Sequence, residues 1–101
     1  MIKNKKMHAI VFDLDTEILK QAYPNPSWNN AYNDICVELE KFGFKRQQGS
    51  VYFGCSDDVN AVTCVLAVQS LNRLFSWFRP SIRDIRMLII EDNNDLYPAI
   101  K

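Results

Sequence analysis

The sequence has little of what marks several protein classes. Three Gly and four Pro in 101 residues are too few for a collagenous or low-complexity chain. The longest apolar runs, such as residues 87–90 (MLII), are far shorter than the roughly 20 residues of a membrane helix. Neither charge dominates, since 12 Lys and Arg balance 12 Asp and Glu. A transmembrane protein and a uniformly basic nucleic-acid binder are therefore excluded, although a local basic patch is not.

The cysteines are few and lack the spacing of a metal site. There are three of them, Cys36, Cys55 and Cys64, and each lies in an apolar stretch of sequence. An odd number in such settings is typical of reduced, buried thiols. Reduced thiols predict a cytoplasmic location.

What the sequence does have is the composition and periodicity of a folded domain. The hydrophobic fraction is 48%, and apolar residues alternate or recur at helical spacing in six segments. The order is strand, helix, strand, strand, helix, strand, at residues 8–14, 28–42, 44–48, 50–55, 58–78 and 82–91. This order predicts an α+β ferredoxin-like β-α-β-β-α-β fold: a four-stranded antiparallel sheet with two helices on one face. The other face would be open to a partner.

Several polar side chains are predicted to share that open face. In the first strand, alternation places the large apolar residues Ile10, Phe12 and Leu14 on one face and Asp13 on the other. The same reasoning places Ser50 and Tyr52 of the third strand, and Asp84 and Arg86 of the fourth, on the face of Asp13. Unpaired carboxylates are costly to bury, so an apolar strand has little structural use for them.

Each of these residues also has an ordinary structural explanation. An Asp at the end of a strand is often a turn or capping residue. Asp84 lies between Arg83 and Arg86 and could form a surface ion pair worth about 1 kcal/mol or less. Ser50 follows Gly49 and is a normal turn residue. Spacing alone therefore leaves the function undecided.

Three segments resemble the virulence-associated protein D (VapD) family: HAIVFDL, AYNDICVELEKFGFKRQQGSVY and WFRPSIRDIRMLIIED. The resemblance implies a ferredoxin-like homodimer related in fold to a CRISPR-associated endoribonuclease family. It also implies ribonuclease activity and frequent membership of toxin–antitoxin pairs. Relatives typically begin at a Met that aligns with Met7. Residues 1–6 are then expected to form a disordered leader, and residues 7–101 one VapD-like domain.

The resemblance also implies functional residues. Asp13, Ser50 and Asp84 match the family's site positions, and Leu19 matches a packing position near the site. Across a two-fold axis, Asp13 would approach its own copy, where the carboxylates could bind Mg²⁺ or act as general bases. Residues expected to contact RNA are Arg83, Arg86, Lys45, Arg46 and Tyr52.

Three functions remain open, in order of preference. The first is a dimeric endoribonuclease, the toxin of a pair whose antitoxin protein would be a second partner. The second is a non-catalytic dimer that binds RNA or a protein. The third is a small-ligand sensor on the open sheet face, because this fold hosts many functions.

Overall fold

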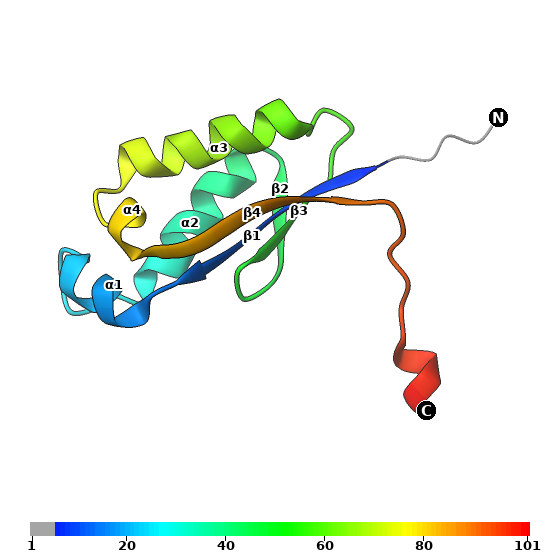
Figure 1. The fold of residues 1–101 in the computed structure, drawn as a ribbon, viewed down its shortest axis with the longest axis horizontal. Helices are drawn as coiled ribbons and strands as arrows, with labels where there is room; N and C mark the ends of the chain where they lie inside the picture. The colour runs from blue at the N-terminus through cyan, green and yellow to red at the C-terminus, as the bar shows by residue number, and fades with distance from the viewer. Residues whose placement is uncertain (1–5) are drawn as a thin grey trace.

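The computed structural model describes residues 6–101, and within them the expected order of strands and principal helices is confirmed (Figure 1). Two short helices, α1 and α4, and a terminal 3-10 helix, η1, are added to the six expected segments. The elements are β1 (Met7–Leu14), α1 (Thr16–Ala22), α2 (Asn30–Lys41), β2 (Phe44–Gln48), β3 (Val51–Gly54), α3 (Ala61–Leu74), α4 (Phe78–Ser81), β4 (Ile82–Ile90) and η1 (Tyr97–Ile100).

The four strands form one antiparallel sheet in the order β2-β3-β1-β4. As predicted, the first and third strands are the central pair and the fourth borders the first. The β1–β4 pairing is the longest, running from Met7 opposite Ile90 to Leu14 opposite Ile82. This α+β architecture is the predicted ferredoxin-like fold.

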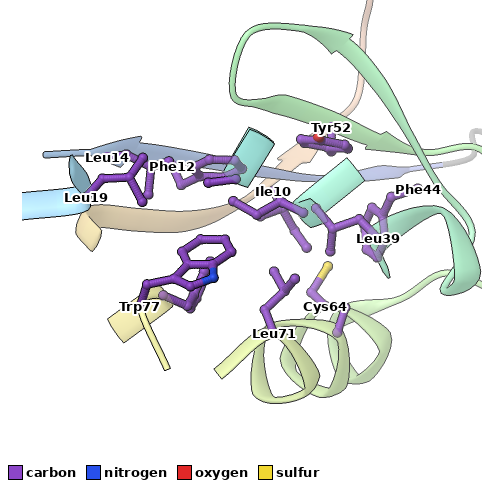
Figure 2. Packing of buried hydrophobic residues seen from close by; sticks show 14 of the residues in the cluster. Ile10, Phe12, Leu14, Leu19, Leu39, Phe44, Tyr52, Cys64, Leu71 and Trp77 are labelled. Atoms are coloured by element: carbon purple, nitrogen blue, oxygen red, sulfur yellow. The ribbon is translucent and has the colours of Figure 1, made fainter. Parts of the chain in front are cut away.

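The core lies between the sheet and helices α2 and α3, which cover one sheet face (Figure 1). Strand β1 contributes Ile10, Phe12 and Leu14, each at most 8% exposed, as alternation predicts. The helices bury residues three or four apart, which is the period of one helix face. Figure 2 shows the three β1 side chains packed in one cluster with Leu39, Tyr52, Leu71 and Trp77.

The helix boundaries differ from the sequence prediction at three points. The helix expected over residues 28–42 begins later, because α2 starts after Asn29, which makes no side-chain cap bond. Helix α3 begins after Asn60, whose side chain forms a reciprocal capping box with Thr63. The helix expected to run to residue 78 instead ends at Leu74, and Pro80 lies inside the short helix α4. It is the third residue of that helix, where a missing N–H breaks no intrahelical bond.

Both ends of the described chain lie away from the core. The C-terminal segment leaves β4 and ends in η1, apart from the sheet and helices (Figure 1). The predicted leader, residues 1–6, lies outside the described residues except for Lys6. The Lys6 Nζ is 3.6 Å from an Oε of Glu91. In residues 6–101, every helix is too short or insufficiently apolar to span a bilayer.

Candidate active site

Two carboxylates lie opposite each other where the edge strand β4 pairs with the central strand β1. Asp13 and Asp84 are register partners, as their predicted common face requires. Directly opposed side chains on an antiparallel pair have Cβ atoms about 5 Å apart. Both side chains are open to solvent, with exposed fractions of 59% for Asp13 and 50% for Asp84. The chain therefore presents an acidic pair at one end of its open face.

Each carboxylate of this pair has an arginine beside it. The Nε of Arg86 donates to an Oδ of Asp84 over 2.9 Å, and this bond raises the pKa of Arg86. An Nη of Arg83 lies 3.6 Å from an Oδ of Asp13. The pair of negative charges is thus balanced by two guanidinium groups that also face solvent, where a phosphate could reach them.

A β-bulge places Arg83 next to Asp13. The register moves from Asp13 opposite Asp84 to Leu14 opposite Ile82, so Arg83 is an extra residue on β4 without a partner on β1. Regular alternation would have sent its side chain toward the helices. The bulge instead allows its guanidinium to contact both Asp13 and Asp15.

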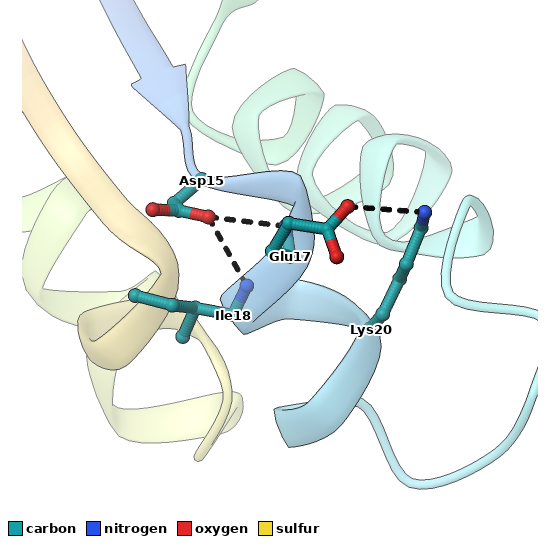
Figure 3. A network of polar contacts seen from close by, with 4 residues as sticks. All are labelled: Asp15, Glu17, Ile18 and Lys20. Atoms are coloured by element: carbon teal, nitrogen blue, oxygen red, sulfur yellow. Dashed lines mark hydrogen bonds and ion pairs between the residues drawn. The ribbon is translucent and has the colours of Figure 1, made fainter.

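Asp15 completes this network, and sequence reasoning missed it. One carboxylate oxygen accepts hydrogen bonds from the backbone N–H groups of Glu17, at 3.0 Å, and Ile18, at 3.1 Å, capping α1 (Figure 3). The other oxygen lies 3.3 Å from an Nη of Arg83. The Ile18 N–H bond, followed by Arg83, lowers the pKa of the Asp15 carboxyl. The preference for Asp at helix N-caps could have revealed the capping role from sequence, but the contact with Arg83 depends on the bulge.

Ser50 lies at the same end of the sheet, on the side of β1 away from Asp84. It occupies the turn before β3, and its carbonyl accepts a hydrogen bond from the Phe12 N–H over 3.1 Å. Ser50 therefore lies opposite Phe12 rather than Asp13, and its expected place on the face of Asp13 stays a prediction. Leu19 is fully buried in the core.

The predicted position of Tyr52 is wrong. Its register partner on β1 is Ile10, so it faces the helices, and it is only 1% exposed. Its ring stacks on Phe12 with centroids 6.0 Å apart. Burial, followed by the nearby Cys36, raises the pKa of Tyr52. A side chain enclosed in this way has no face left for an RNA base.

The same error in the alternation of β3 affects its apolar residues. Val51 and Phe53, expected against the helices, lie on the open face and are half-buried there. The prediction placed the apolar residues of the third strand against the helices, but in the structure they belong to the apolar centre of the open face. Ala9 is fully buried on it because Phe53 and Leu88 lie on either side.

The two basic residues of β2 occupy opposite faces of the sheet. Lys45 pairs with Phe53 and shares the open face, where it is exposed. Arg46 pairs with Tyr52, and its Nε donates to the Gly49 carbonyl over 2.9 Å within the hairpin. Of the two, Lys45 is the residue placed on the same surface as the acidic pair.

Within residues 6–101, no group of three or more His, Cys, Asp or Glu side chains is arranged to hold a metal ion. Asp13 and Asp84 offer carboxylate oxygens, yet each already has an arginine as its ion-pair partner. The described residues of this chain therefore do not by themselves fit Mg²⁺, which prefers a nearly complete octahedron of oxygens. Mg²⁺ at Asp13 stays a prediction.

Comparison with known proteins identifies the family. Residues 6–95 match the family model of the CRISPR associated protein Cas2. The chain is 48% identical over 97 residues to Endoribonuclease VapD 2 of Riemerella anatipestifer, covering 93% of this chain and 99% of that protein. It is 52% identical over 95 residues to the Endoribonuclease VapD homolog of Helicobacter pylori, covering 94% and 97%.

The chain belongs to the VapD family. A further relative, Endoribonuclease VapD of Dichelobacter nodosus, is 42% identical over 95 residues, covering 94% of this chain and 98% of that protein. These matches include all of the strands and helices that make up the sheet and its core. The resemblance inferred from the three sequence segments is thus confirmed.

Proposed function

We propose that this VapD-family chain is an endoribonuclease whose active site is the acidic pair, Asp13 and Asp84, with its two arginines. The observation that carries the proposal is the register of β1 and β4, which sets the carboxylates opposite each other on an open face. The names of the relatives, each an endoribonuclease VapD, support the same activity. RNA is then the substrate.

The side chains suggest how cleavage proceeds. Asp13, near the end of β1, acts as general base and removes a proton from the attacking hydroxyl, either water or the RNA 2′-hydroxyl. The attacking oxygen bonds to phosphorus as the bond from phosphorus to the leaving ribose oxygen breaks, and the leaving oxygen takes a proton from water. Arg83 and Arg86 bind the phosphate oxygens and offset the charge that develops on them. Ser50 donates a hydrogen bond to the phosphate. Lys45 contacts the RNA backbone further along the same face.

The proposal includes a homodimer formed through the open sheet face. Val11, Val51 and Phe53 are half-buried on this face of a single protomer, and Leu88 is 45% exposed. A second copy would cover this apolar centre and bring the two Asp13 residues toward each other. Leu88→Asp should convert a dimer into a monomer in light scattering. Monomeric wild-type protein at micromolar concentration would contradict this part of the proposal.

Two further parts of the proposal concern biology. The protein acts as the toxin of a toxin–antitoxin pair, with an antitoxin protein as partner, and it works in the cytoplasm. Growth arrest on expression of wild-type protein, absent with the Asp13→Asn variant, would support the toxin role. Unchanged growth with active protein would refute it.

The decisive experiment is cleavage of a labelled single-stranded RNA by purified protein, with Mg²⁺, with Mn²⁺ and with chelator. Asp13→Asn should lower the rate at least about 100-fold, which is the usual contribution of a general base. Asp84→Asn should lower it as well. Asp92→Asn, which removes an exposed carboxylate beyond the end of β4, is the matched control and should cleave normally. Full activity in folded Asp13→Asn would refute the proposal.

One observation favours a second function, a non-catalytic module that binds RNA or a protein. Each carboxylate is already paired with an arginine, as in an ordinary surface network. In that case no RNA would be cleaved under any metal condition. The Asp13→Asn variant would bind RNA or its protein partner as well as the wild type does.

A further inference from the structure

Asp15 divides its carboxylate between two partners. One oxygen accepts the Glu17 and Ile18 N–H groups and so is committed to the first turn of α1. The other oxygen points away from the helix in Figure 3 and lies 3.3 Å from an Nη of Arg83. The backbone N–H of Asp15 also donates to the Ser81 carbonyl over 2.7 Å. Asp15 is thus held at several points, and its side chain is 26% exposed.

The shorter of the two ion pairs of Arg83 is the one with Asp15. The Arg83 side chain is 61% exposed and belongs to the extra residue of the β-bulge. The two terminal nitrogens of its guanidinium have different partners, with one on Asp15 at 3.3 Å and the other on Asp13 at 3.6 Å. The contact with Asp13 is longer than a hydrogen bond, so a phosphate oxygen can replace it at little cost.

We propose that Asp15 is a positioning residue that holds Arg83 in place for the scissile phosphate. When RNA binds, the nitrogen of Arg83 that faces Asp13 turns to a phosphate oxygen, while the other nitrogen stays on Asp15. Asp13 is thereby released to act as base beside a phosphate that is already bound. This inference rests on the proposed ribonuclease function, and it assigns a role to a residue outside the expected site.

The two roles of Asp15 can be separated by substitution. Asn is as good an N-cap as Asp, so Asp15→Asn keeps the cap but loses the charge that holds Arg83. Glu is not a preferred N-cap residue, so Asp15→Glu weakens the cap but retains a carboxylate within reach of Arg83. If Asp15 positions Arg83, Asp15→Glu should be more active than Asp15→Asn. If Asp15 only caps the helix, Asp15→Asn should be the more active variant.

The experiment measures kcat, KM and thermal midpoint for both variants with the same labelled RNA. Asp15→Asn should keep the midpoint of the wild type but lower kcat about 10- to 100-fold, as misplacement of a catalytic partner does. Its KM should rise by a smaller factor than kcat falls, because Arg83 contacts the phosphate in the bound state but stabilises the charge that develops in the transition state more strongly. Asp15→Glu should recover much of kcat despite a lower midpoint. Glu17→Gln, which removes a charge that is paired with Lys20, is the matched control.

A double variant tests whether Asp15 acts through Arg83. Asp15→Asn combined with Arg83→Gln should be no slower than Arg83→Gln alone. Normal kcat in Asp15→Asn, or the reverse order with Asp15→Glu the slower variant, would overturn the inference. If Asp15→Asn does not fold, Asp15→Ser replaces it under the same criteria. Activity retained in Asp13→Asn would instead refute the proposed function itself.

Discussion

A buried polar contact joins the two long helices, and its removal should destabilise the protein in a pH-dependent way. Ser70 of α3 donates from its Oγ to an Oε of Glu38 on α2 over 2.6 Å. Ser70 is 3% exposed and Glu38 is 8% exposed. Lys41 Nζ lies 3.3 Å from the other Glu38 oxygen, and Arg73 donates to Ser70 over 3.4 Å. The perturbation is Ser70→Ala.

The expected loss follows from the chemistry of this contact. A hydrogen bond to a charged group contributes about 2 kcal/mol to stability, and one buried carboxylate oxygen would lose its donor. Ala is the better helix former by about 0.5 kcal/mol, which partly offsets the loss. The free energy of unfolding should therefore fall by about 1.5 kcal/mol. For a chain of this size, the thermal midpoint should fall by about 9 °C.

The effect should depend on pH because the bond acts on the ionised carboxylate. The Ser70 hydrogen bond is the largest cause that lowers the pKa of Glu38 below its ordinary value of 4.5. A carboxyl whose pKa is lower in the folded state stabilises the fold at pH values above its unfolded pKa. That stabilisation is lost as the pH falls through the folded pKa. The difference between wild type and Ser70→Ala should thus be largest at neutral pH and should shrink in acid.

Urea unfolding followed by circular dichroism, at about pH 7 and about pH 3, measures this difference. Ser76→Ala is the matched control, since Ser76 is exposed between α3 and α4. A Ser70→Ala variant whose free energy of unfolding lies within about 0.5 kcal/mol of the wild-type value at neutral pH would contradict the expected loss. An equal difference at both pH values would contradict the role of the ionised carboxylate.

Two further predictions concern residues expected to bind RNA. Tyr52→Phe keeps the ring stacked on Phe12, so RNA cleavage should stay within about twofold of wild type; a large loss of activity in the folded variant would place Tyr52 at the site after all. Lys45→Gln should weaken RNA binding and reduce the slope of log affinity against log salt by about 0.7, the value for one phosphate contact on a single strand. Arg46→Gln should change that slope less, because Arg46 is bonded to its own hairpin. Equal slopes for both variants, measured by fluorescence anisotropy, would contradict this assignment.

Alternation in the sequence predicted one strand of the site correctly and another wrongly. On β1, the large residues Ile10, Phe12 and Leu14 leave no doubt about the buried face, so Asp13 is placed correctly. On β3, both faces carry aromatic residues, and the prediction places the more apolar set, with Val51 and Phe53, against the helices. The tyrosine ring is mostly apolar, however, and it packs well in a core when its hydroxyl finds a partner. Polarity along one strand does not settle its orientation when both sheet faces are apolar.

The sequence by itself determined the order of the elements, the family and the exposed position of Asp13. These properties follow from local periodicity and from motifs, which are contained within short stretches of chain. Only the tertiary structure decided that Asp13 faces Asp84, that a bulge turns Arg83 toward both Asp13 and Asp15, and that Tyr52 is enclosed. Strand register is set by pairing between segments some 70 residues apart in the sequence. A shift of one residue in that register would separate the two carboxylates, and no local pattern encodes it.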